Sequence, residues 1–90
     1  MSKLWILRPR IGLPKDDDPW EPWYDKAFGF IVRADSQVEA RQMADKGGGD
    51  ETRVHPAEKR HPWLDPKYST CYRLVAEGEP GIIMKDFAAA

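Results

Sequence analysis

The chain has 90 residues, of which 41% are hydrophobic and 32% are charged, and its formal net charge is −1. This length allows one domain with one hydrophobic core, and the composition is that of a globular rather than a disordered chain. The balanced charge disfavours direct binding to DNA or RNA, because neutralising many phosphates needs a surplus of Lys and Arg. We therefore expect residues 1–90 to form a single domain.

The cysteine content and the hydropathy of the chain indicate in which cellular compartment it resides. Cys71 is the single cysteine, which excludes an internal disulfide and gives no sign of an oxidising environment. The apolar run at residues 4–7 is too short for a signal peptide, and no run approaches the ~18 residues of a membrane span. The sequence thus predicts a cytoplasmic protein with no membrane partner.

The first third of the chain predicts two strands separated by a long loop. Residues 3–8 form an apolar run that predicts a short strand ended by Pro9. Prolines and glycine recur over residues 9–25, which excludes a helix or a strand ladder there. Residues 27–34 predict the strongest strand, in which Phe28, Phe30 and Val32 share one face. Gly29 on the other face predicts a gap in which an aromatic ring from the loop lies against the backbone.

A helix is predicted from Ser36 to about Lys46. Ser36 and Glu39 have the spacing of a capping box, in which each side chain accepts from a free amide at the helix N-terminus. The apolar residues expected to form its buried stripe are Val38, Ala40, Met43 and Ala44. Three glycines at 47–49 predict the end of the helix, with a glycine in the left-handed conformation at the C-cap.

The remainder of the chain predicts a second long loop and a β-hairpin. Residues 50–68 are polar and contain three prolines, and residues 62–68 repeat the Pro-Trp-x-Asp pattern of residues 22–25. Residues 70–76 and 82–87 predict two strands joined by a short turn. The expected fold is α+β: a mostly antiparallel, four-stranded sheet with one helix on one face and two long loops rich in Pro and Trp.

The first long loop concentrates acidic and aromatic residues, which is typical of a protein-recognition surface because Trp and Tyr dominate binding hot spots. The alternative is that Trp20 and Trp23 cover the sheet face opposite the helix, which a sheet with one helix leaves open. The two Pro-Trp-x-Asp loops are expected to face each other across one surface. The residues expected to bind the partner are Asp16, Asp17, Asp18, Trp20, Glu21, Trp23, Tyr24, Asp25, Trp63, Asp65 and Tyr68.

The other reactive residues give no indication of a cofactor, metal or catalytic site. Asp16–Asp18 lack the spacing and the turn glycine of a calcium loop, and His55 and His61 lack the ligand spacing of a zinc site. Cys71 is expected to be a small buried hydrophobe in a strand. Asp25 and Asp65 would form a catalytic carboxylate pair only if the loops meet, and otherwise each caps its own turn.

Several motifs resemble those of a set of small uncharacterised bacterial and phage-type proteins. The shared segments are Lys-Leu-Trp-Ile-Leu-Arg-Pro (residues 3–9), Pro-Trp-Tyr-Asp-Lys-Ala-Phe-Gly-Phe with the helix after it (22–46), Pro-Trp-Leu-Asp-Pro-Lys-Tyr-Ser-Thr-Cys (62–71) and Asp-Phe-Ala-x-Ala (86–90). The resemblance transfers no catalytic residue. It implies a bacterial or phage-infected cell, and it suggests an inhibitor of a host system such as an anti-CRISPR protein.

The sequence therefore favours a non-enzymatic interaction protein that binds a protein partner with a basic surface, such as a bacterial defence complex. The alternative is a small-ligand-binding or enzymatic domain with a pocket between the two Pro-Trp-x-Asp loops. A third interpretation is a homodimer in which the loop aromatics form the interface.

Overall fold

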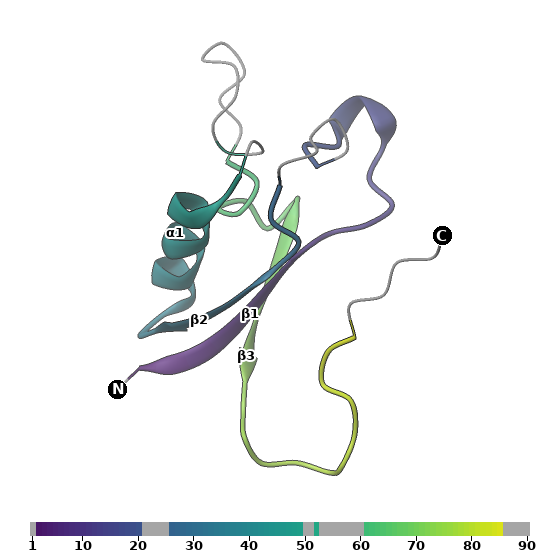
Figure 1. Ribbon diagram of the computed structural model, residues 1–90. Helices are drawn as coiled ribbons and strands as arrows, with labels where there is room; N and C mark the ends of the chain where they lie inside the picture. Colours follow the sequence, from purple (N-terminus) through teal and green to yellow (C-terminus); the bar gives the residue numbers. More distant parts are fainter. Residues whose placement is uncertain (1, 21–25, 50–51, 53–60, 86–90) are drawn as a thin grey trace.

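In the part of the chain that the structure describes, one α-helix packs on one side of a three-stranded sheet (Figure 1). The computed structural model describes residues 2–20, 26–49, 52 and 61–85. Its elements are listed in chain order as β1 (Lys3–Pro9), a 3₁₀ turn η1 (Lys15–Asp17), β2 (Phe30–Ala34), α1 (Gln37–Gly47) and β3 (Ser69–Leu74). No helix among the described residues is long and apolar enough to cross a membrane.

The first strand is the centre of the sheet, in the order β2-β1-β3, and both of its pairings are antiparallel. Leu7 lies opposite Phe30 on one side and Cys71 on the other, whereas Ile6 lies opposite Ile31 and Tyr72. Because side chains alternate across a strand, these two rows belong to opposite faces of the sheet. The Leu7 row faces α1, and the Ile6 row faces away from it.

The prediction of a four-stranded sheet is wrong, because the described part of the chain has three strands. Residues 82–85 lie outside any strand and are exposed, and residues 86 and 87 are outside the described ranges. The predicted hairpin fails because residues 75–81 include Gly78, Pro80 and Gly81, which make a wide bend instead of a tight turn. The chain therefore leaves the β3 edge instead of pairing with it (Figure 1).

The helix prediction is confirmed at its start. The Ser36 hydroxyl accepts from the Glu39 amide at 3.2 Å, and the Glu39 carboxylate accepts from the amide of Asp35 at 3.5 Å. At the other end, Gly48 has φ −70°, so the expected left-handed C-cap is wrong. Gly47 packs closely against β2 instead, since a Cβ there would lie 3.3 Å from the Phe30 ring, which is tighter than an ordinary contact.

The buried face of α1 differs from the predicted stripe. Ala40, Arg41 and Ala44 are buried, whereas Val38 and Met43 are exposed. The small side chains of Ala40 and Ala44 let α1 approach the sheet closely, whereas the apolar side chains of Val38 and Met43 lie outside this contact. The buried hydrophobic residues of the described chain are Leu7, Trp20, Ala34, Ala40, Ala44, Trp63 and Cys71.

The gap expected at Gly29 exists, but it does not hold an aromatic ring. A Cβ at this position would lie 3.0 Å from Cδ of Arg8 and 3.2 Å from the carbonyl oxygen of Leu7. Gly29 therefore lets the aliphatic stem of Arg8 lie against the backbone. Phe28, predicted to be in the strand, precedes β2 and is exposed.

Candidate functional site

The two long loops meet at one end of the sheet, and we call this region the loop junction (residues 15–20 and 61–68). The Trp20 indole donates to the carbonyl of Tyr68 at 3.0 Å, and the Tyr68 hydroxyl donates to the Asp17 carboxylate at 2.5 Å. The Lys67 ammonium lies 2.6 Å from the same carboxylate. These contacts join segments about fifty residues apart in sequence. Residues 22–25 lie outside the described ranges, so the expected contact between the two Pro-Trp-x-Asp segments stays a prediction.

Two indoles form the buried base of the loop junction. Trp63 is completely buried and Trp20 is 6% exposed, and their ring centroids lie 4.8 Å apart in an edge-to-face arrangement. Phe30 of β2 meets Trp63 in the same way, at 4.9 Å. Both indoles thus belong to the core on the helix side, so the interpretation that Trp20 covers the opposite face is wrong. Their burial also leaves almost no indole surface for a partner to contact.

Arg41 of α1 anchors the second loop through hydrogen bonds. Its guanidinium donates to the carbonyl of Trp63 at 2.9 Å, to the Ser69 hydroxyl at 2.7 Å and to the Ser69 carbonyl at 3.2 Å. The Ser69 hydroxyl in turn donates to the carbonyl of Pro62 at 2.7 Å. Arg41 and Ser69 are both buried. A buried guanidinium is stable only with several acceptors, and backbone carbonyls supply them here.

Sequence reasoning missed Arg41 and Ser69. The signal available for Arg41 was its position between Ala40 and Ala44, which places it on the helix face with the buried alanines. Nothing in the pattern around Ser69 distinguishes it from an exposed strand serine. Its role depends on the carbonyl of Pro62, which the turn at residues 62–68 brings to it.

The consecutive aspartates occupy three different environments. Asp16 is exposed, Asp17 is half-buried between Lys67 and Tyr68, and the Asp18 carboxylate accepts from the Trp20 amide at 3.0 Å. The hydrogen bond to Asp17 raises the pKa of Lys67, and it is also the main reason that the pKa of Tyr68 is raised. Of the three consecutive aspartates, only Asp16 is therefore classed as exposed to solvent.

Asp65 caps its own turn, as one of the two interpretations predicted. Its carboxylate accepts from the Lys67 amide at 2.9 Å, and its carbonyl accepts from the amides of Tyr68 and Ser69. The remaining expected partner-binding residues, Glu21, Trp23, Tyr24 and Asp25, lie outside the described residues, so a carboxylate pair with Asp25 stays untested.

The reactive side chains elsewhere have structural partners. His61 forms a 2.9 Å contact with the Asp45 carboxylate at the C-terminal end of α1. Within the described ranges, no three His, Cys, Asp or Glu residues are placed to hold a metal ion. Cys71 is buried beneath α1, and this burial raises the pKa of its thiol. His55 lies outside the described ranges.

A pocket of about 370 Å³ lies beside the loop junction. Its charged lining residues are Arg8, Arg10, Lys26 and Asp18, and its aromatic ones are Trp20 and Phe28. None of its lining residues comes from the second Pro-Trp-x-Asp loop, so this is not the pocket that the small-ligand interpretation expects. Lys26 and Arg10 instead donate to backbone carbonyls, those of Trp20 at 2.6 Å and Pro66 at 2.8 Å, which strengthens the junction.

No protein-family model, no curated protein and no solved structure matches the chain. The fold and the loop junction therefore have to be interpreted from their own chemistry.

Proposed function

We propose that this is a non-enzymatic interaction protein that binds a protein partner through the exposed rim of the loop junction. The observation that supports the proposal is the hydrogen-bonded contact between Asp17 and Tyr68, together with the indole bond from Trp20. Loops fixed in this way lose little conformational entropy when a partner binds, and rigidly positioned loops commonly carry binding function.

The rim combines apolar and charged groups. Leu64 in the second loop is 40% exposed, and Lys15, Asp16 and Lys67 are exposed in the two segments that form the junction. An apolar contact with a charged surround is typical of a protein interface, where the rim charges mainly set partner choice and association rate. In this proposal Leu64 supplies the contact area, and Asp16 meets the basic surface of the partner.

The resemblance to phage-type proteins suggests the class of partner. We propose a bacterial defence complex as that partner, and inhibition of the complex as the role. This part of the proposal rests on the motifs of the sequence, and it makes bacterial lysate the appropriate source for a binding experiment.

The test is an affinity capture from bacterial lysate with single substitutions on the rim. Leu64→Asp should lose the partner, and Asp16→Lys should weaken its capture, while circular dichroism shows that both variants stay folded. Asp17 and Asp18 are unsuitable because their replacement also removes bonds within the loop junction. Gln42→Lys is the control, because Gln42 is exposed on α1 and belongs to neither segment of the junction. Equal recovery of every captured protein by all four chains would show that the rim is not the binding surface.

A further inference from the structure

The middle of the sheet face opposite α1 is apolar, and no described element covers it. We call this face the open face: its apolar residues are Leu4, Ile6, Ile31, Tyr72 and Leu74, and Arg8, Arg33 and Thr70 lie on the same face. Ile31 and Tyr72 are 61% and 63% exposed. They flank Ile6 of the central strand, one from β2 and the other from β3. Single exposed apolar residues are common, but a contiguous apolar face marks an interaction surface.

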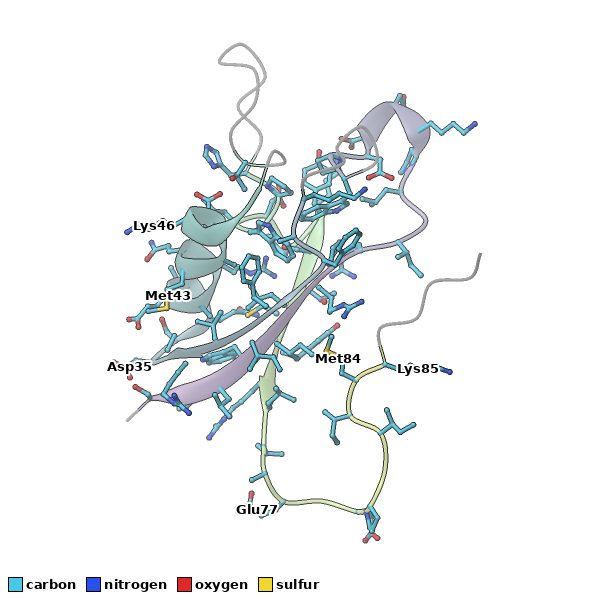
Figure 2. All side chains as sticks on the ribbon, viewed as in Figure 1. Asp35, Met43, Lys46, Glu77, Met84 and Lys85 are labelled. Carbon is cyan, nitrogen blue, oxygen red and sulfur yellow. The ribbon has the colours of Figure 1, made fainter. Side chains whose placement is uncertain are left out.

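A second apolar surface lies next to the open face. The chain after β3 turns back beside it, and its exposed Ile82 and Ile83 are followed by Met84, whose side chain points toward the sheet in Figure 2. Between this segment and the sheet is a gap of about 370 Å³, lined by Leu4, Ile6, Ile31, Leu74, Val75, Ala76, Ile83 and Met84. Every lining residue has an apolar side chain, so the lining of the gap is mainly apolar.

The area available matches that of a stable protein interface. On the open face and the segment at residues 75–84, seven large apolar side chains are 38–81% exposed. A fully exposed side chain of this kind offers roughly 100 Å² of apolar surface, and these seven are on average about 60% exposed, so one copy offers about 400 Å². Two copies would bury about 800 Å² of apolar area, which corresponds to roughly 1,400 Å² in total at the usual apolar fraction of an interface. This total exceeds the ~1,000 Å² expected of a specific interface.

Charge favours a second copy of the same chain as the occupant. The three strands contain no acidic residue, and Arg33 is exposed on the open face opposite Leu4. The acids of this side of the molecule, Glu77 and Glu79, are exposed on the bend that follows β3. In a symmetric pair, the acids of each copy can meet Arg33 of the other, and the formal net charge of −1 causes little repulsion.

We propose that the open faces of two copies pack against each other in a symmetric homodimer, with residues 75–84 of each copy enclosing the contact. This interface is separate from the loop junction, and it differs from a dimer formed by the loop aromatics. It buries the sheet face that α1 leaves uncovered.

Sedimentation velocity of the full chain over about 1–500 µM tests the proposal, because an interface of this size is expected to have a micromolar dissociation constant. The native chain should change from monomer to dimer across this range. Ile31→Glu should raise the dissociation constant about 100-fold or more, since symmetry places two carboxylates in one apolar contact. Tyr72→Glu is a second variant at an equally exposed position, and it should have the same effect.

Val38→Glu is the matched control, because Val38 is 65% exposed on the opposite side of the sheet, on α1. Its dissociation constant should equal that of the native chain. Circular dichroism of each variant at 1 µM checks the fold of the monomer. A native chain that stays monomeric at 500 µM would overturn the proposal, whether or not the rim of the loop junction binds its partner. The proposal would also be overturned if the chain dimerised but Ile31→Glu and Tyr72→Glu changed the dissociation constant no more than Val38→Glu does.

Discussion

Replacement of Arg41 by Met tests whether the buried guanidinium holds the second loop against the core. Met has a similar length and favours a helix, so the substitution removes the charge and the donors while keeping most of the packing volume. It would remove three hydrogen bonds, one to Trp63 and two to Ser69. The acceptors lie in a buried region, where water cannot easily replace the lost donors.

The expected magnitude follows from these bonds. A hydrogen bond to a charged group contributes about 1.5–3 kcal/mol, and an acceptor left buried without a donor costs about 1–3 kcal/mol. The Ser69 hydroxyl can keep its bond to Pro62, and the apolar Met gains some burial, so we expect a loss of about 3–4 kcal/mol rather than the full sum. A domain of this size has a free energy of unfolding of roughly 5–13 kcal/mol, so the loss is a large fraction of it.

Urea unfolding followed by tryptophan fluorescence measures this loss, because the two buried indoles lie beside the bonds removed. With a slope near 1.3 kcal/mol per molar urea, the midpoint should fall by about 2–3 M. Gln42→Met places the same side chain at the adjacent exposed position of α1 and should change the midpoint by less than about 0.4 M. A decrease below about 0.5 M for Arg41→Met would show that the guanidinium does not hold the loop.

Two further substitutions test the core of the loop junction. Trp20→Ala should cost about 3–5 kcal/mol and lower the melting temperature by more than about 12 °C, whereas Leu64→Ala, at an exposed position, should change it little; a Trp20→Ala protein with unchanged melting temperature would place the indole outside the core. Because burial raises the pKa of Cys71, the folded chain keeps the thiol proton to a higher pH than the unfolded chain. Stability is therefore fully present below the ordinary thiol pKa and falls as the pH rises through the raised value, and Cys71→Ala should reduce this fall in urea titrations at successive pH values. If the native chain and Cys71→Ala lost the same stability at alkaline pH, this prediction would be wrong.

Local patterns predicted most of the elements. The helix start at Ser36 and strands close to β1, β2 and β3 follow from the capping spacing and from apolar periodicity, because these signals act over a few residues. The strand expected at residues 82–87 shows the limit of this reasoning. Its residues have high strand propensity, but a strand forms only where a partner edge is within reach, and the bend after β3 decides that.

The candidate site was predicted in part. The similarity of the two Pro-Trp-x-Asp segments led to the prediction that these segments face each other, which stays a prediction because residues 22–25 lie outside the described ranges. The structure shows that the neighbouring parts of the two long loops meet, through the bond between Tyr68 and Asp17. The pattern did not reveal that Trp20 and Trp63 are core residues. Aromatic residues in a loop have the same composition whether they dock inward or outward, and only the space between sheet and helix determines which occurs.

The sequence by itself determined the α+β class, a capped helix and two loops with matching motifs, since periodicity and turn residues are local properties. The tertiary structure decided which side of the sheet the indoles occupy, how Arg41 is buried, and which apolar face stays open. These depend on distances between segments far apart in the chain, such as Arg41 and Ser69, which no local pattern encodes. The physical reason is that burial is a property of the assembled layers, and a side chain acquires it only from the neighbours that folding brings to it.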